Sequence, residues 1–189
     1  MAHKASLPDA NVLYSAPLRD IFVQLAYDQF VPVRWTSAIH EECISSLASD
    51  RRDIQITQLE MLRDKINNAV PDCLILNYES LISTLTLPDD DDRHVLAAVI
   101  PGECTYIVTW NLKDFPQTEL EKYGIEAVSP DDSLMQLYNV DEVLFRMSVQ
   151  TVRNRLRHPP KTAPDYLYIL KKSGLCRLSA ALATWISEI

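Results

Sequence analysis

The sequence contains very little glycine, and this scarcity excludes two large classes of nucleotide-binding protein. The 189 residues include 3 glycines, at positions 102, 124 and 174. A P-loop and a G-x-G-x-x-G dinucleotide fingerprint each need several glycines within a few residues, because the backbone must approach the phosphates closely. We therefore exclude P-loop NTPases and Rossmann-type dehydrogenases.

Long apolar runs and paired cysteines are also missing. No apolar stretch approaches the roughly 18–20 residues that cross a bilayer, and the first residues lack the apolar region of a signal peptide. The 4 cysteines form no C-x-x-C pair, so the sequence predicts neither a zinc site nor a disulfide framework. We expect a cytoplasmic protein without a membrane partner, whose cysteines are small buried residues.

Basic residues are scarce over most of the chain. Residues 1–144 hold 24 acids and 10 bases, a net charge of −14, whereas residues 145–189 hold 8 bases and 2 acids, a net charge of +6. A protein that simply binds duplex nucleic acid would instead carry a basic footprint. The asymmetry suits a body whose acids hold a metal ion and a tail that meets phosphate or an acidic partner.

Apolar patterning predicts that strands alternate with helices up to about residue 130. We expect helices at 16–30, 38–48, 53–69, 89–100 and 119–123. We expect strands at 31–35, 73–77, 105–109 and 125–128, and one before Asp9 that Pro8 shortens. After Pro130 only helical patterns follow, over 131–156, 165–172 and 176–189. This order is typical of a three-layer α/β domain with a central, mainly parallel sheet flanked by helices, residues 1–140, followed by a helical C-terminal appendage, residues 141–189.

Several segments far apart in the sequence bring acids to the carboxyl ends of the predicted strands, where ligands bind in open α/β sheets. The candidates are Asp9, Glu42, the run Asp89–Asp92, and Asn111 with Asp114. Each one alone is explained as a helix cap or as a solvated helix start. Together they repel one another unless a cation compensates. Mg²⁺ and Mn²⁺ prefer such oxygen ligands and keep waters, one of which can attack a phosphodiester.

The same segments resemble the PIN-domain ribonucleases, and most closely the VapC-like toxins of type II toxin–antitoxin pairs. Over roughly residues 5–135 the motifs occur in the family's order and spacing. They are Asp9-Ala10-Asn11-Val12-Leu13-Tyr14, Trp35-Thr36-x-x-Ile39-x-Glu41-Glu42, Leu87-Pro88-Asp89-x-Asp91-Asp92-Arg93-His94-Val95-Leu96-Ala97-Ala98 and Thr109-x-Asn111-Leu112-Lys113-Asp114-Phe115-Pro116. The resemblance places the four acids of the family on Asp9, Glu42, Asp92 and Asp114.

The resemblance implies an endoribonuclease that cleaves single-stranded or loop RNA with Mg²⁺ or Mn²⁺. It implies a homodimer that a protein antitoxin restrains. The four acids would bind the metal and catalyse the reaction, and a supporting group would surround them: Asn11, Asp89, Arg93, Thr109 and Asn111. Asn111 departs from the family, in which Asp is common, but its amide still offers a neutral oxygen ligand. Glu41 is an alternative to Glu42, which fits the motif better, and Arg93 contacts either phosphate or the neighbouring acids.

The basic tail offers a candidate RNA-binding surface, Arg153, Arg155 and Arg157. A cationic margin would help RNA to approach an acidic site. The same residues could instead bind an acidic antitoxin segment or form only a solvated helix face.

Two other functions compete with a nuclease. A PIN-like protein that has lost catalysis would only bind RNA or a protein partner, but the complete set of acids argues against this. A receiver-like domain also gathers acids around Mg²⁺, yet it needs a lysine before the proline that follows the last strand. The present sequence has Val128-Ser129-Pro130 there.

Overall fold

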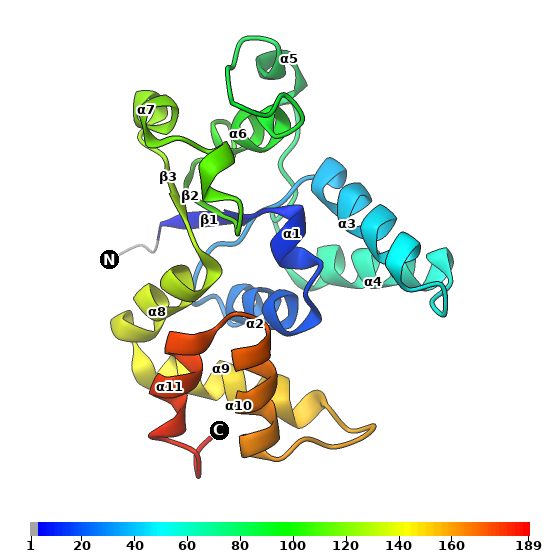
Figure 1. The fold of residues 1–189 in the computed structure, drawn as a ribbon, viewed down its shortest axis with the longest axis vertical. Helices are drawn as coiled ribbons and strands as arrows, with labels where there is room; N and C mark the ends of the chain where they lie inside the picture. Colours follow the sequence, from blue (N-terminus) through cyan, green and yellow to red (C-terminus); the bar gives the residue numbers. More distant parts are fainter. Residues whose placement is uncertain (1–3) are drawn as a thin grey trace.

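The computed structural model describes residues 4–189, and a small parallel sheet lies at its centre (Figure 1). The sheet has the order β1-β2-β3, with β1 at Ala5–Pro8, β2 at Cys104–Val108 and β3 at Glu126–Val128, and both pairings are parallel. The predicted α/β class, with a parallel sheet flanked by helices, is confirmed. Because the strands run in one direction, their carboxyl ends meet at one edge of the sheet.

Two predicted strands, 31–35 and 73–77, are wrong, because the chain there is extended without forming a regular ladder. Val33 makes one isolated parallel bridge with Ser6, and Trp35 makes one with Leu74. Pro32 lacks an N–H group and so can only accept, here from the backbone N–H of Ser6. The segments 31–35 and 73–77 therefore continue the sheet beyond β1, each through one isolated bridge.

Helices cover this sheet, and local capping explains where several of them begin. The body contains α1 (Ala10–Leu13), α2 (Ala16–Tyr27), α3 (Ser37–Asp50), α4 (Ile56–Ala69), α5 (Glu79–Ile82), α6 (Arg93–Val99), α7 (Gln117–Leu120) and two 3₁₀ turns, η1 (Leu112–Asp114) and η2 (Glu121–Tyr123). At the start of α3, the Thr36 hydroxyl accepts from the backbone N–H of Ile39. The prediction that a helix begins at Asp89 is wrong. Its carboxylate accepts from the backbone N–H of Asp91 in a turn, and α6 begins only at Arg93.

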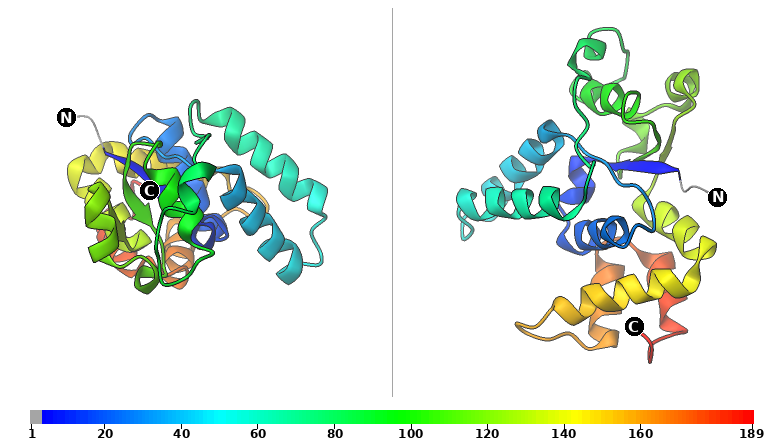
Figure 2. Two further views of the ribbon diagram at one scale, coloured as in Figure 1. Left: turned by 90° about the horizontal axis from the view of Figure 1, so that it is seen from above. Right: turned by 180° about the vertical axis from the view of Figure 1, so that it is seen from behind.

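The C-terminal helices form a layer beside α2, and the second and third of them pack against it (Figures 1 and 2). They are α8 (Pro130–Val140), α9 (Glu142–Arg155), α10 (Ala163–Lys172) and α11 (Cys176–Ala183). The predicted helical stretch 131–156 is two helices, because Asp141 ends α8 and caps α9 by accepting from the backbone N–H of Leu144. The division at residue 140 stays a prediction, although the apolar core runs through both parts without interruption.

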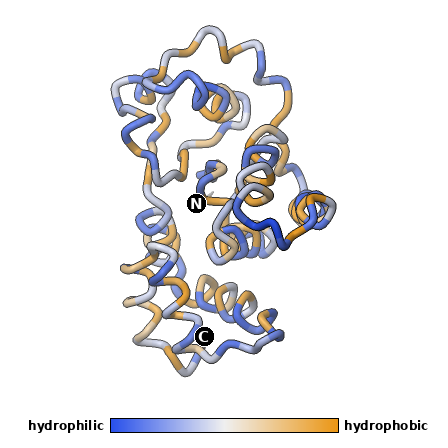
Figure 3. Tube along the Cα trace, turned by 45° about the vertical axis from the view of Figure 1, so that its right-hand side comes forward, coloured by the Kyte–Doolittle hydropathy of each residue, from blue (hydrophilic) through white to orange (hydrophobic). Residues whose placement is uncertain are grey.

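Apolar residues alternate with hydrophilic ones along the trace of most helices, as amphipathic helices require (Figure 3). Cys43, Cys73 and Cys104 are buried as predicted, but Cys176, the first residue of α11, is exposed. Within residues 4–189, no helix combines the length and the apolar character needed to cross a membrane.

Candidate active site

An open cavity of about 440 Å³ lies at the carboxyl edge of the sheet. It brings together four of the residues predicted from distant segments, Asp9, Glu42, Asp92 and Asn111. The other lining residues are Ala10, Asn11, Tyr14 and Ser46. Sequence reasoning missed Tyr14 and Ser46 as site residues. A usable signal existed for Ser46, because it lies one helical turn after Glu42 on α3.

Asp9 is the buried acid of this cavity, with 4% of its surface exposed. It caps α1, and one carboxylate oxygen accepts from the backbone N–H of Ala10 at 2.6 Å. The other oxygen accepts from the Thr109 hydroxyl at 2.8 Å and from the Asn11 amide. Burial raises the pKa of Asp9, and the Thr109 and Ala10 hydrogen bonds oppose that rise.

Thr109 connects the two sides of the cavity. Its hydroxyl accepts from the Asn11 amide at 3.0 Å and from the backbone N–H of Asn111 at 3.1 Å, while donating to Asp9. The side chain is fully buried at the end of β2. Thr109 therefore fixes Asp9, Asn11 and the chain at Asn111 relative to one another.

Replacing Thr109 by Val keeps the shape of the side chain but removes all three hydrogen bonds. We expect the pKa of Asp9 to rise further, because a hydrogen bond that stabilises the carboxylate is lost. We also expect the free energy of unfolding to fall by about 1–3 kcal/mol, since buried polar groups are left without a partner. Carboxyl ¹³C NMR titration and urea unfolding measure the two effects. The half-buried Thr105 on the same strand gives the control Thr105→Val, and equal effects in both variants would contradict the role given to Thr109.

Asp92 is a second acid of the cavity whose pKa is raised. Burial raises its pKa to about 6, and the negative charges of Asp9, Asp89 and Asp114 add to the rise. Asp114 does not line the cavity itself, but it lies close enough on η1 to act on Asp92. Near neutral pH these carboxylates repel one another, and this repulsion is relieved by a proton or by a bound cation.

Glu42 is held by His94, which follows Asp92 by two residues in the third motif. The Nε2 atom of His94 lies 2.8 Å from a carboxylate oxygen of Glu42. Burial lowers the pKa of His94, but the hydrogen bond to Glu42 and the charges of Asp9 and Asp92 outweigh it, so the net pKa is raised. The raised pKa favours the protonated form of His94, whose charge complements that of Glu42.

The remaining predicted residues lie outside the cavity. Asp89 is exposed, and Arg93 forms an ion pair with Asp90 at 3.2 Å. The predicted RNA-binding arginines lie at the end of α9 and in the segment after it, and none of them lines the cavity: Arg153, Arg155 and Arg157. Arg153 donates to the backbone carbonyl of Lys161 at 3.0 Å.

The donors present suit a hard divalent cation in their chemistry. Across residues 4–189, no three Asp, Glu, His or Cys side chains already stand close enough to form a ligand set. Mg²⁺ needs only one or two carboxylates, because it keeps several of its waters. An open cavity lined by carboxylates whose mutual repulsion is not neutralised fits such a hydrated ion better than a closed zinc site.

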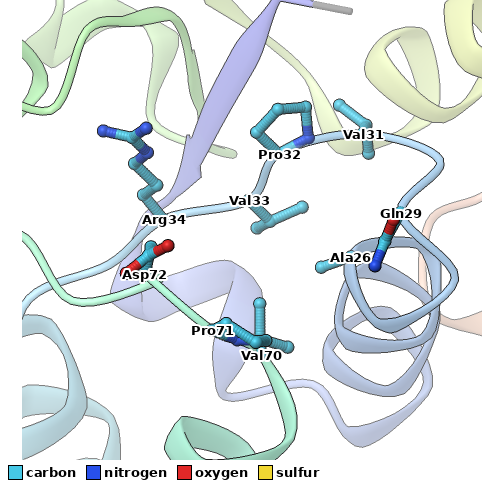
Figure 4. Close-up of a pocket in the computed structure, with 9 residues that line it drawn as sticks. All are labelled: Ala26, Gln29, Val31, Pro32, Val33, Arg34, Val70, Pro71 and Asp72. Atoms are coloured by element: carbon cyan, nitrogen blue, oxygen red, sulfur yellow. The ribbon is translucent and has the colours of Figure 1, made fainter.

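A second cavity, of about 280 Å³, has a different character (Figure 4). It lies between the end of α2 and two extended segments, and it is lined by residues 31–34 around the bridged Val33 and by residues 70–72, which precede Leu74. Most of its lining is apolar, and its only opposite charges are Arg34 and Asp72. It gathers no cluster of acids, and the chemistry remains at the carboxyl edge.

Two comparisons with known proteins agree with the motifs. Residues 130–184 match the family model of the VapC50 C-terminal domain. A Mycobacterium tuberculosis (strain ATCC 25618 / H37Rv) protein named "Putative ribonuclease VapC50" is 33% identical over 100 residues, which cover 53% of this chain and 59% of the relative. The matched region is therefore little more than half of either protein. No solved structure matches the chain.

Proposed function

We propose that the chain is a VapC-like PIN protein and that the acidic cavity is the active site of a metal-dependent endoribonuclease. The observation that supports this most is the convergence of Asp9, Glu42, Asp92 and Asn111 on one cavity, with Asp114 beside it. The name of the relative, "Putative ribonuclease VapC50", points to the same chemistry. The proposed substrate is the phosphodiester bond of single-stranded or loop RNA.

In this proposal Asp9, Glu42, Asp92 and Asp114 hold Mg²⁺ or Mn²⁺. When bound, the ion supplies charge stabilisation of the scissile phosphate and lowers the pKa of the attacking water. The protein supplies the geometry. Thr109 and Asn11 fix the Asp9 carboxylate, and His94 fixes Glu42.

The proposal extends to partners and location. A VapC-like toxin acts on RNA in the cytoplasm, as a homodimer that a protein antitoxin restrains, and we propose each of these for the present chain. The two family matches support a toxin of this kind.

A cleavage assay tests the function. We expect the protein to cut single-stranded RNA with Mg²⁺ or Mn²⁺ and to be inactive with EDTA, while duplex RNA of the same sequence stays intact. Binding of the same RNA is measured in parallel. RNA binding without cleavage under any of these metals would favour the catalytically silent alternative, and cleavage that persists in EDTA would contradict metal dependence.

The arginines after α9 make a separate prediction about substrate approach. Changing Arg153, Arg155 and Arg157 to Gln should weaken RNA binding and flatten its dependence on salt, because each phosphate contact contributes about 0.7 to the slope of log K against log salt. Fluorescence anisotropy over a range of salt concentrations measures this slope. If both slope and affinity stay at the wild-type values, these arginines do not contact RNA.

A further inference from the structure

The C-terminal helices touch the edge of the candidate active site at one glycine. Gly174 ends α10 with a φ of +90°. A β-carbon at this position would lie 2.7 Å from Cη2 and 2.9 Å from Cζ2 of Trp110. The indole therefore lies directly against the turn between α10 and α11, at the end of these helices that faces the sheet (Figure 1). No residue larger than glycine fits there unless Trp110 moves.

Trp110 is joined to the acidic cavity through its backbone. It lies between Thr109 and Asn111, and its N–H donates to the side-chain oxygen of Asn11 at 3.2 Å. The Asn11 amide in turn donates to Asp9. Although the backbone is tied to the site, Trp110 remains 40% exposed. Trp110 thus precedes the cavity-lining Asn111 directly, and its partly exposed ring packs against Gly174.

Positive charge accompanies this ring. Lys171 and Lys172 immediately precede the Gly174 turn, and both are exposed. Lys113 follows Trp110 by three residues, with 84% of its side chain exposed. Aromatic rings combined with lysines are what proteins use to bind single-stranded nucleic acid, because the rings stack on bases and the lysines meet phosphates. An acidic cavity that must receive a polyanion needs such cations at its margin.

We infer that Trp110 stacks on a base of single-stranded RNA beside the acidic cavity, held in position by Gly174, and that Lys171 and Lys172 contact the adjacent phosphates. The inference rests on the proposed ribonuclease function and names how its substrate is held. It also gives the C-terminal helices a role, since their turn places the stacking ring. Trp110 is a binding residue here, and Gly174 is a positioning residue.

The test compares the binding of two short probes to the metal-free protein in EDTA, by fluorescence anisotropy. One probe is a single-stranded RNA of mixed sequence, and the other is an abasic strand of the same length. Trp110→Ala should weaken binding of the RNA by about 5- to 150-fold, the range expected for one lost stacked base. Trp110→Phe should keep most of the affinity, and binding of the abasic strand should not change. Lys171→Gln with Lys172→Gln should weaken binding of both probes.

Gly174 has a matched control in Gly124. Both glycines have a positive φ, +90° and +69°, but a β-carbon at Gly124 would meet nothing within 4 Å. Gly174→Ala should therefore lower RNA affinity by displacing the ring, whereas Gly124→Ala should bear similar backbone strain without that loss. Thermal melting verifies that each variant is folded. If Gly174→Ala does not fold, the test depends on Trp110→Ala.

Two results would overturn the inference: a Trp110→Ala variant that binds RNA as tightly as the wild type, or one that loses affinity equally for RNA and for the abasic strand. Cleavage with Mn²⁺ is measured separately. Binding through Trp110 without cleavage would refute the ribonuclease function and leave the stacking inference standing. If Trp110→Ala cleaves and binds RNA as the wild type does, the stacking inference is refuted and the ribonuclease function stands.

Discussion

Asp9→Asn and Asp92→Asn should each lower Mn²⁺-dependent RNA cleavage by about a thousandfold or more, because each removes a charged ligand from the proposed metal site. Asn keeps the shape of the side chain and one oxygen, so a loss of activity reports the missing charge. Initial rates of cleavage of a labelled single-stranded RNA measure the effect.

Asp91→Asn is the matched control, since Asp91 is exposed next to Asp92 and does not line the cavity. We expect it to cleave RNA at the wild-type rate. Full activity of both Asp9→Asn and Asp92→Asn would contradict the role of these acids as metal ligands.

The same Asp92 variant also has a signature in stability. The pKa of Asp92 in the folded protein, about 6, is raised above its ordinary value of 3.8, so the charged carboxylate opposes folding. This penalty is complete above pH 6 and disappears below pH 4. Metal-free Asp92→Asn should therefore melt at or above the wild-type temperature at neutral pH, and the difference should shrink as the pH falls through 6.

Phe145→Ala should destabilise the whole protein by about 3–5 kcal/mol, the usual cost of removing a buried aromatic ring. Phe145 lies on α9 and is fully buried. Its ring packs edge-on against Phe30 of the body at 6.2 Å and against Tyr138 of α8 at 5.8 Å. The melting temperature should fall by roughly 6–20 °C.

Differential scanning calorimetry measures this effect. It also tests whether the body and the C-terminal helices unfold together. Because α2 packs on α9, we expect one cooperative transition that shifts as a whole. Leu144→Ala is the control, since the neighbouring Leu144 is 51% exposed and should change stability by less than about 0.5 kcal/mol. Two transitions, of which Phe145→Ala moves only one, would show that the C-terminal helices unfold separately.

An apolar run becomes a strand only where a neighbouring strand pairs with it, and the run at 73–77 makes only a single bridge. The strand at 105–109 has such a run, and the structure has β2 one residue earlier. The pattern at 31–35 looks similar, but Pro32 has no N–H group to donate, and only Val33 forms a bridge with the neighbouring strand, to Ser6. Local pattern alone does not contain that information.

The sequence predicts only those parts of the candidate site that follow from the direction of the strands. That Asp9 and Asn111 lie close together follows from the rule that parallel strands end at one edge, and no tertiary detail is needed. The pairing of His94 with Glu42 and the contact of Gly174 with Trp110 depend on how helices pack across the chain. For the second contact, the sequence offers only the presence of Gly174 in a chain with few glycines. It does not indicate that Trp110 packs against this glycine.

The most direct test of a divalent ion in this cavity is a thermal melt of the wild-type protein over a titration with Mn²⁺. Binding to the folded state alone raises stability by about 2.7 kcal/mol when the ion is at a hundred times its Kd, which corresponds to a rise in melting temperature of roughly 5–11 °C. We predict this rise in the wild type and in Asp91→Asn, and a clearly smaller one in Asp9→Asn and Asp92→Asn. A wild-type melting temperature that stays constant up to millimolar Mn²⁺ would contradict the account and leave the acids with a structural role.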